Sequence, residues 1–184
     1  MQILETLSDG RQLLRVAHPF ATSIAPGQMI ADGALRLPLL RHDATQGTVD
    51  IVVYDATALT TANWRVVGDI LAPPPASNTL RFITHDDAIF TALHALMMWP
   101  RELRKQCTVI SVFTAALPFR PGPSRLFAPH FPSHAIAALP LLEDWGVFNR
   151  IVHPNSPGCY DGELTDLLAQ LAPVDCEYVL PSIA

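Results

Sequence analysis

The sequence predicts a β-rich first half followed by a doubly wound α/β second half, and three observations support this. Short apolar runs separated by Gly or Pro turns fill the first 72 residues, which is typical of a small antiparallel barrel or sandwich. From residue 78, apolar runs of strand length alternate with helical segments, which indicates a Rossmann-like parallel sheet covered on both faces. Between the halves lies the proline-rich stretch Ala72–Ser77. We place the boundary there, with domains at residues 1–72 and 78–184.

Composition limits the classes of protein to which the chain can belong. The 184 residues are 49% hydrophobic and only 16% charged, as expected of a globular protein with a sizeable core. The net charge of −5, without a Lys/Arg cluster, argues against nucleic acid or an anionic membrane as partners. No apolar run reaches the ~18 residues of a membrane span. The N-terminus lacks the pattern of a signal peptide, so the expected compartment is the cytoplasm.

Turn signals divide the first half into short strands. Asp9-Gly10 is typical of a hairpin, and Pro26-Gly27 marks a second turn. In Thr48–Tyr54, three β-branched residues alternate with other residues, which predicts a sheet with one better-buried face. The expected strands are Gln2–Leu7, Arg11–His18, Met29-Ile30, Leu35–Arg41, Thr48–Tyr54 and Val66–Leu71.

The second half opens with a predicted strand, turn and helix. Thr79–Thr84 has the composition of a buried strand, and the helical spacing that follows from Ile89 ends at Pro100. The turn between them, Thr84–Asp87, has a Thr-x-x-Asp pattern that can cap a helix. In doubly wound folds this turn normally faces a phosphate, but here it has no glycine and contains two aspartates.

The remaining elements complete the predicted parallel sheet. Its further strands are Cys107–Phe113, His134–Ala138, Phe148–Val152 and Cys176–Leu180. Leu139–Trp145 is a predicted short helix, and Asp161–Leu171 is a predicted amphipathic helix with Asp161 as N-cap. Pro118–Pro132 is too rich in proline for regular structure and is expected to be a packed surface loop. It is either a static cover for the sheet or a docking surface.

Cysteine and histidine spacing argues against a metal centre. Cys107, Cys159 and Cys176 are far apart and lack the paired spacing of zinc or iron–sulfur ligands. Cys107 and Cys176 open apolar strands, which predicts burial, whereas Cys159 lies in a Pro-Gly-Cys-Tyr-Asp-Gly loop. The histidines likewise show no metal-ligand spacing.

Four short motifs, in this order, carry a resemblance to a known family. They are Pro26-Gly27-Gln28, then Leu35-Arg36-Leu37-Pro38-Leu39, then Gly68-Asp69-Ile70-Leu71, and finally Gly158–Leu167. Their order and spacing resemble those of the ferredoxin-reductase-like flavoproteins, nearest to the electron-transfer subunit of dihydroorotate dehydrogenase. The resemblance implies that FAD is the cofactor and that Arg36 contacts its pyrophosphate. The residues it assigns to cofactor binding are Gly27, Gln28, Arg36, Pro38, Leu39, Gly158, Cys159 and Gly162.

The chain also departs from the family pattern. The glycine-rich turn that holds the pyridine-nucleotide phosphates in the family is replaced by Thr84–Phe90, so we do not expect NAD(P) to bind in the usual way. The cysteine cluster of a [2Fe–2S] centre is absent, so no iron–sulfur cluster is expected. The family's Cys-Gly-Pro turn is also absent.

The sequence leaves three functions open. The first is an electron-transfer component that holds FAD and passes electrons to a protein partner. The second is a degenerate family member that binds no cofactor and serves as a structural or regulatory subunit. The third is an unrelated hydrolase that uses His85, Asp86 or Asp87 at the carboxyl edge of the sheet. The oligomeric state, including a homodimer, stays open.

Overall fold

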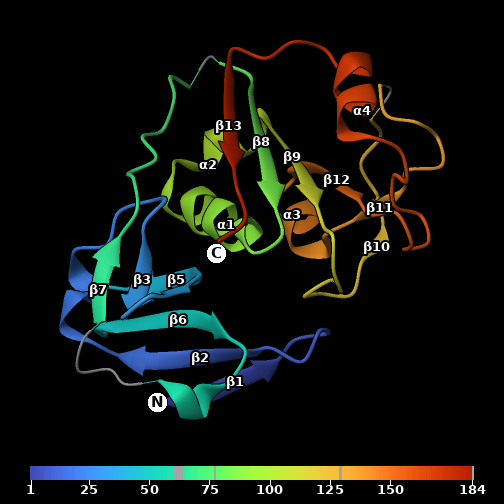
Figure 1. Ribbon diagram of the computed structural model, residues 1–184. Coiled ribbons are helices and arrows are strands. Elements are labelled where there is room, and N and C mark those ends of the chain that lie inside the picture. Colours follow the sequence, from blue (N-terminus) through green and yellow to red (C-terminus); the bar gives the residue numbers. More distant parts are fainter. Residues whose placement is uncertain (60–63, 77, 129, 184) are drawn as a thin grey trace.

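Two antiparallel sheets form the first half of the chain, and a parallel sheet with helices forms the second (Figure 1). The computed structural model describes residues 1–59, 64–76, 78–128 and 130–183. Ser77 of the predicted linker and Pro129 of the proline-rich segment therefore lie outside the described residues. The predicted fold class is confirmed, whereas the division at residue 72 stays a prediction.

The two antiparallel sheets pack over a shared apolar core. The larger has the order β1-β2-β6-β5 and the smaller the order β4-β3-β7. Their inward side chains, Leu14, Ile30, Leu37 and Ile51 among them, are almost completely buried. The strands are β1 (Gln2–Thr6), β2 (Gln12–Ala17), β3 (Met29–Asp32), β4 (Leu35–Leu37), β5 (Leu39–Asp43), β6 (Thr48–Val53) and β7 (Trp64–Val67). Two short 3₁₀ turns, Pro19–Thr22 and Ala56–Ala58, connect them.

Four parallel strands form the second sheet, in the order β12-β9-β8-β13. The strands are β8 (Leu80–His85), β9 (Cys107–Val112), β12 (Phe148–Val152) and β13 (Cys176–Leu180). All pairings are parallel and in continuous register. The first strand of this half, β8, therefore lies inside the sheet, between β9 and β13.

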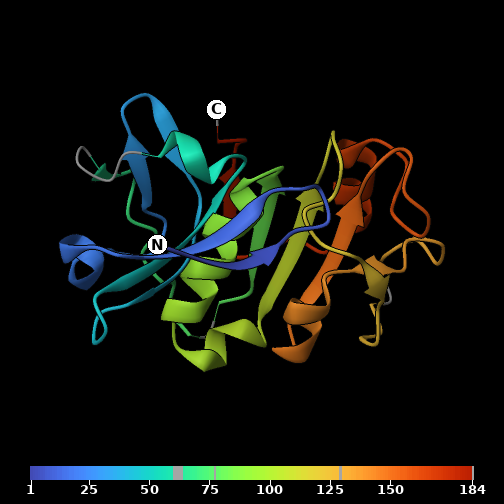
Figure 2. The ribbon, with the colours of Figure 1, turned by 90° about the horizontal axis from the view of Figure 1, so that it is seen from below.

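Helix α1 lies between the parallel sheet and the larger antiparallel sheet (Figure 2). One continuous core joins α1 to Leu13 and Val52 of the first half and to Phe82 and Val109 of the second. Nine consecutive residues of α1, 88–96, are buried, so it has no solvent-facing stripe over that length. The helices are α1 (Ala88–Met98), α2 (Arg101–Arg104), α3 (Pro140–Asp144) and α4 (Leu164–Gln170). Helix α4 covers the opposite face of the parallel sheet, where Leu167 packs with Ile110 and Val152.

One expected strand does not join the parallel sheet. Only the end of His134–Ala138 is a strand, β11 (Ala137–Ala138), and it pairs antiparallel with β10 (Gly122–Pro123). The backbone N–H of Ala137 donates to the carbonyl of Gly158 at 2.7 Å, and the carbonyl of Ile136 accepts from Ser124 at 2.7 Å. The prediction was wrong because neighbouring loops take up the hydrogen-bonding groups of this segment.

The predicted N-cap of the helix near residue 165, α4, is also wrong. The N-cap of α4 is Glu163, not Asp161, and it makes no side-chain capping bond. Before α4, Tyr160 is held beside β12, because its N–H donates to Ile151 and its carbonyl accepts from His153, each at 2.9 Å. Asp161 instead lies 3.7 Å from the Nε2 atom of His134.

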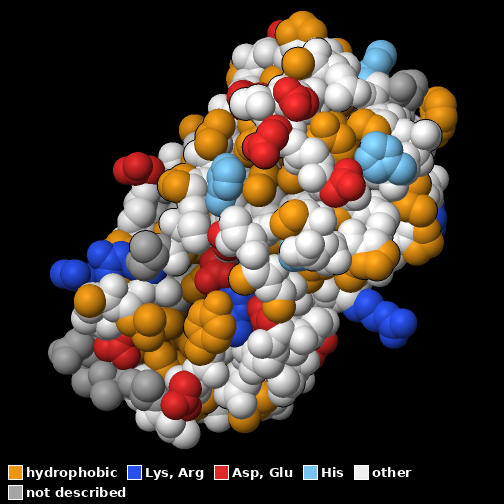
Figure 3. Space-filling view, turned by 45° about the vertical axis from the view of Figure 1, so that its right-hand side comes forward, with side chains coloured by type: hydrophobic (Ala, Val, Ile, Leu, Met, Phe, Trp, Pro, Cys, Tyr) orange, Lys and Arg blue, Asp and Glu red, His pale blue; other side chains and the backbone are white. Residues whose placement is uncertain are grey.

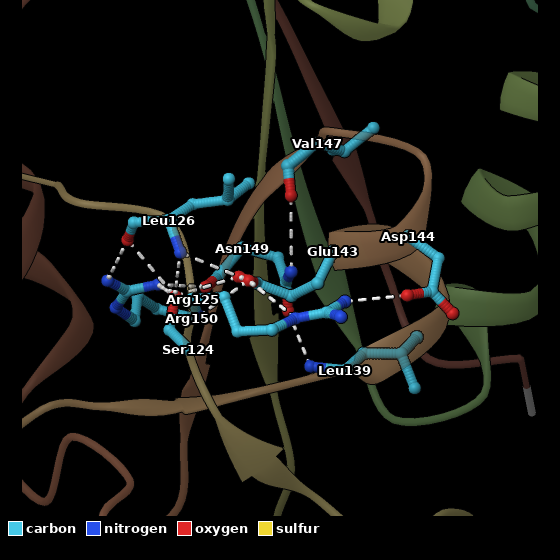
Figure 4. A network of polar contacts seen from close by, with 9 residues as sticks. All are labelled: Ser124, Arg125, Leu126, Leu139, Glu143, Asp144, Val147, Asn149 and Arg150. Atoms are coloured by element: carbon cyan, nitrogen blue, oxygen red, sulfur yellow. Dashed lines mark hydrogen bonds and ion pairs between the residues drawn. The ribbon is translucent and has the colours of Figure 1, made fainter.

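A buried polar network anchors the proline-rich loop (Figure 4). The Glu143 carboxylate accepts hydrogen bonds from the Ser124 hydroxyl and the Arg125 N–H, both at 2.8 Å, and from the Leu126 N–H at 3.2 Å. The Arg150 guanidinium also donates to the Ser124 hydroxyl at 2.8 Å. Glu143 and Arg150 are each more than 90% buried, so the loop is held by a bridged pair of buried charges. The segment is packed on the protein as expected, but it is not without regular structure, because Gly122–Pro123 forms strand β10.

Charged side chains are dispersed on the face of the molecule shown in Figure 3. Lys and Arg side chains do not form a continuous basic surface there. Among the described residues, no helix is long and apolar enough to cross a membrane.

Two histidines meet at the contact between β5 and α1. The Nδ1 atom of His42 lies 3.0 Å from Nε2 of His94, and His94 is 1% exposed. Burial, and then the neighbouring His42, lower the pKa of His94 to about 4 from its ordinary 6.5. The folded protein therefore resists protonation of His94 more than the unfolded chain does.

We predict that acid destabilises the protein through His94. Between pH 6.5 and 4 the unfolded chain binds more protons at this residue than the folded protein does. The free energy of unfolding therefore decreases by about 3 kcal/mol as the pH is lowered through this range. Urea unfolding across this range measures the slope. His94→Leu should flatten it, whereas His130→Ala, at an exposed position, should leave it unchanged. An equal slope in His94→Leu and the wild type would contradict the assignment.

Candidate functional site

A cleft of about 610 Å³ lies between the smaller antiparallel sheet and the parallel domain. One wall comes from the sheet β4-β3-β7 and the turn after β7, and the other from α1, β13 and the C-terminal residues that follow. The cleft therefore collects residues that are more than 150 positions apart in the sequence, from Gly27 to Ile183. Its lining residues are Gly27, Met29, Arg36, Val67, Gly68, Asp69, Leu71, Ala88, Thr91 and residues 177–183.

Two arginines lie on the same face of the smaller sheet, and one of them, Arg36, lines this cleft. Arg36 on β4 and Arg65 on β7 both pair with Ala31 on the central strand β3. Residues paired across strands share one face, so the side chains of Arg36 and Arg65 leave the sheet on the same face as Ala31, one on either side of it. The Arg36 guanidinium also donates to the carbonyl of Ala34 at 3.2 Å, which holds it over its own turn. Such an arginine pair suits a phosphate or pyrophosphate.

Arg65 is the residue that sequence reasoning missed. It lies in β7 (Trp64–Val67), which begins two residues before the predicted strand Val66–Leu71, so Arg65 was outside that prediction. Arg36 and Arg65 lie on either side of Ala31 because of the register in which β4 and β7 pair with β3. This register depends on the assembled sheet and cannot be predicted from one strand. A strand pattern Trp-Arg-Val-Val, with one cation among apolar residues, is the only signal that the sequence offers for it.

Gly27 joins the predicted turn to the end of the barrel. Its φ is +89°, and a Cβ atom there would lie 2.5 Å from Leu71 Cγ and 2.7 Å from the Asp69 carbonyl oxygen. The Leu71 N–H donates to the Pro26 carbonyl at 2.8 Å. The first and third motifs of the resemblance are therefore in direct contact, and their close approach requires glycine.

The other predicted residues of the first half have structural surroundings. The Gln28 side chain accepts a hydrogen bond from the Ala25 N–H at 2.9 Å, which closes the turn. The Pro38 carbonyl accepts from the Val52 N–H at 3.0 Å. Leu39 is fully buried in the barrel core. None of these three lines the cleft, so their assignment to a cofactor stays a prediction without support from the cleft.

The motif near residue 160 does not line the cleft either. Gly158 packs against Ile136 and Ala137, and Gly162 lies against the ring of Tyr160. Cys159 is 4% exposed, and burial raises the pKa of its thiol, which disfavours the reactive thiolate. The structure thus brings together Gly27 and Arg36 and leaves Gly158, Cys159 and Gly162 at another part of the parallel domain.

The opposite wall of the cleft carries an anchored tyrosine. Tyr178 on β13 stacks on Phe82, with ring centroids 5.1 Å apart, and its hydroxyl donates to the Ala72 carbonyl at 2.8 Å. Burial raises the pKa of this phenol. Asp69 and Glu177 add negative charge to the cleft, and Glu177 is paired with Arg81 at 3.0 Å.

The start of α1 is closed by side chains of the protein itself. Asp87 is the N-cap residue, but its carboxylate makes no capping bond and instead pairs with Arg11 of the β1–β2 hairpin. Asp86 has φ +48°, and its carboxylate accepts hydrogen bonds from the Thr114 N–H at 3.0 Å and hydroxyl at 3.2 Å. The Thr84 hydroxyl donates to Ser111 at 3.2 Å and is also not a cap. The predicted capping pattern is wrong because longer-range partners bind each of these side chains.

Arg11 is the centre of this closed helix start. It is 3% exposed, and its Nε donates to Asp9 at 2.6 Å. Its guanidinium lies 5.4 Å from the ring centroid of Phe90. Burial acts to lower the pKa of Arg11, but hydrogen bonds and charges from Asp9 and Asp87 outweigh it and raise the pKa. The charge of Asp87 is therefore neutralised within the protein, and a phosphate approaching α1 would meet an occupied N-terminus.

The described residues contain no group of three or more His, Cys, Asp or Glu side chains that could hold a metal ion. All three cysteines are free thiols. Cys107 is buried as the sequence predicted, whereas Cys176, for which burial was also predicted, is only half-buried on the edge strand β13. His153 makes two structural contacts, with Nε2 3.1 Å from the Ala115 carbonyl and Nδ1 accepting from the Asn155 N–H at 3.0 Å.

Comparison with known proteins supplies a fold-level relationship. No protein-family model and no curated protein sequence matches the chain. Among solved structures, an NADH-dependent reduced ferredoxin-NADP oxidoreductase matches over 98% of this chain, with a TM-score of 0.57 and 13% identity. The chain has a ferredoxin-reductase-like fold.

Two further structures with this fold agree. An Amycolatopsis cytochrome P450 reductase matches over 92% of the chain, with a TM-score of 0.56 and 14% identity. A siderophore-interacting protein from Acinetobacter baumannii matches over 98%, with a TM-score of 0.52 and 8% identity. The chain spans 66%, 55% and 74% of these three proteins in turn. The ferredoxin-reductase-like fold thus extends over nearly the whole chain and covers part of each larger neighbour.

The contact of Gly27 with Leu71 predicts a large effect of a single methyl group. Gly27→Ala should lower the free energy of unfolding by about 2–4 kcal/mol, from left-handed backbone strain plus overpacking against Leu71 and Asp69. Gly33→Ala is the matched control, because φ there is +62° and no atom lies within 4 Å of the added Cβ. It should show only the strain, about 1–2 kcal/mol. Equal losses in the two variants, measured by chemical unfolding, would show that the contact is unimportant.

Proposed function

We propose that this chain is an electron-transfer component of the ferredoxin-reductase type that holds FAD in the cleft and passes electrons to a protein partner. The observation that carries the proposal is the position of Arg36 on the wall of a cleft between the two halves of a ferredoxin-reductase-like fold, with Arg65 on the same face of the sheet. The nearest functional likeness that we propose is the electron-transfer subunit of dihydroorotate dehydrogenase, because of the four ordered sequence motifs.

The residues of the cleft fit such a cofactor in two respects. Arg36 and Arg65 would neutralise the two charges of a pyrophosphate, with Ala31 leaving space between them. Aliphatic residues such as Met29 and Val67 offer an apolar surface for a flat ring system. Bound FAD would supply the means to accept an electron pair and release electrons one at a time. The chain's own residues would bind it, orient it and limit its contact with water.

A second function is favoured by a different observation. The start of α1, where a nucleotide phosphate would approach, is closed by Arg11, Asp87 and Asp86, and Arg36 has backbone acceptors in its own turn. A structural or regulatory subunit without a cofactor would need neither an open phosphate site at the start of α1 nor a free Arg36 guanidinium. The hydrolase alternative has less support, because Asp86 and Asp87 both have structural partners. The cytoplasm stays the predicted compartment.

The absorption spectrum of the freshly purified protein, with and without added FAD, separates the first two functions. A flavin spectrum, or saturable binding of FAD followed by fluorescence quenching, is expected. A colourless protein that binds no FAD would favour the cofactor-free subunit.

Arg36→Ala tests the contact with the pyrophosphate. Loss of a charged hydrogen bond of about 1.5–3 kcal/mol should weaken FAD binding roughly 10- to 150-fold. Arg41→Ala is the matched control, since Arg41 is exposed on β5 and does not line the cleft. Titration by fluorescence gives both affinities. Equal affinity of Arg36→Ala and Arg41→Ala would rule out the contact.

We further predict that the protein does not oxidise NADH or NADPH by itself. Asp86 and Asp87 replace the glycines of a phosphate-binding turn, and Arg11 and Thr114 hold them in place. Consumption of the nicotinamide is followed by absorbance in the presence of an artificial electron acceptor. No saturable turnover is expected, with or without FAD. Robust turnover would contradict this interpretation of the turn.

A further inference from the structure

A separate pocket of about 240 Å³ lies at the amino-terminal ends of the parallel strands, on the face that α4 covers. The register pairs Thr108 of β9 with Arg81 of β8 and with Phe148 of β12, so these three side chains leave the same face of the sheet. Thr108 precedes Ile110 by two residues, and Ile110 packs with Leu167 of α4, which identifies the face. All three side chains line the pocket.

Three parts of the second half enclose this pocket. They are the starts of β8, β9 and β12, the residues 171–174 that follow α4, and the end of the proline-rich segment. None of the lining residues lines the cleft between the two halves of the chain. The pocket is therefore separate from the place to which we assign FAD.

The lining of the pocket is mostly apolar and includes the side chains of Phe131, Phe148 and Leu171. Ligand pockets commonly combine such an apolar lining with a few polar groups. An apolar protein cavity of roughly 150 Å³ is large enough to bind benzene. This pocket is larger, so it has room for one aromatic ring with a polar substituent.

Arg81 adds a buried charge to the lining. The residue is only 7% exposed. Its guanidinium donates to the Glu177 carboxylate at 3.0 Å and to the Ala172 carbonyl at 2.6 Å. Because Glu177 already compensates the positive charge, the pocket suits a neutral ligand better than an anion. The Nε atom of Arg81 is shielded from solvent and donates to no group among the described residues.

Gln106 adds an acceptor that complements this donor. Its side-chain nitrogen donates to the Ala76 carbonyl, which identifies the other atom of the amide as the oxygen. That oxygen is shielded from solvent and accepts no hydrogen bond within the part of the chain that the structure describes. Buried polar atoms are nearly always bonded, and leaving one unpaired costs free energy. A ligand that offers both an acceptor and a donor would satisfy the two atoms together.

We propose that this pocket binds a small, uncharged aromatic amide. The carbonyl of the ligand accepts from Arg81 Nε, its N–H donates to the Gln106 oxygen, and its ring lies beside Phe131 and Phe148. Because both protein atoms are shielded, binding requires a small rotation of each side chain toward the pocket that it lines. The proposal does not rest on flavin, and binding is measured on protein without added cofactor.

Three probes with the same ring test this chemistry. Benzamide carries both the carbonyl and the N–H groups, benzoate replaces the N–H groups with a negative charge, and toluene lacks the polar group. NMR titration of the isotope-labelled protein should show saturable binding of benzamide, at least tenfold tighter than binding of benzoate or toluene. The signals of the Arg81 Nε–H and the Gln106 amide should shift with benzamide. No saturable binding of benzamide, or equal affinity for all three probes, would overturn the proposal.

A variant that fills the pocket tests the location. Ala172 is exposed at the pocket wall, so Ala172→Trp adds bulk there while the backbone carbonyl that accepts from Arg81 is kept. Ala44→Trp is the matched control, because Ala44 is exposed in the turn between β5 and β6. Ala172→Trp should weaken benzamide binding at least tenfold, and Ala44→Trp should bind it as the wild type does. Thermal unfolding checks that both variants fold. Equal affinity of the two variants would place benzamide elsewhere and overturn the proposal.

Discussion

The burial of α1 between two sheets is the constraint on which the rest of this structure depends. A helix with buried residues at nine successive positions cannot be covered by one sheet alone. The parallel sheet covers one side, and Leu13 and Val52 of the larger antiparallel sheet cover another. The two halves therefore share one core, and the helix fixes how they meet. The contact of His42 with His94 lies at the same junction, between β5 and α1.

The same packing determines the chemistry at the start of α1. Because the β1–β2 hairpin lies against the helix, Arg11 reaches Asp87 from the first half of the chain. A buried guanidinium needs such carboxylates, and Asp9 and Asp87 provide them. In a doubly wound fold this position usually receives a phosphate. Here an ion pair of the protein itself, between Arg11 and Asp87, occupies this position.

The cleft follows from the way α1 joins the halves. With α1 and β13 on one side and β4-β3-β7 on the other, residues from three distant segments line one space. Its two walls differ: Arg36 lies on one wall, and Tyr178, whose hydroxyl is bonded to Ala72, lies on the other. A cation on one wall is the feature of this cleft that suits a phosphate group.

The sequence by itself determined the class of fold and most of its elements. Alternation in Thr48–Tyr54, the turn at Pro26-Gly27 and the strand–helix order from Thr79 to Trp99 are local patterns, and local patterns record burial directly. Only the tertiary structure decided which side chains meet. Asp87 lies in a sequence that can cap a helix, but its carboxylate pairs with an arginine 76 positions away. Arg65 lies beside Ala31 only because of the register in which β7 pairs with β3. Such contacts depend on sheet order and helix packing, which no short stretch of sequence contains.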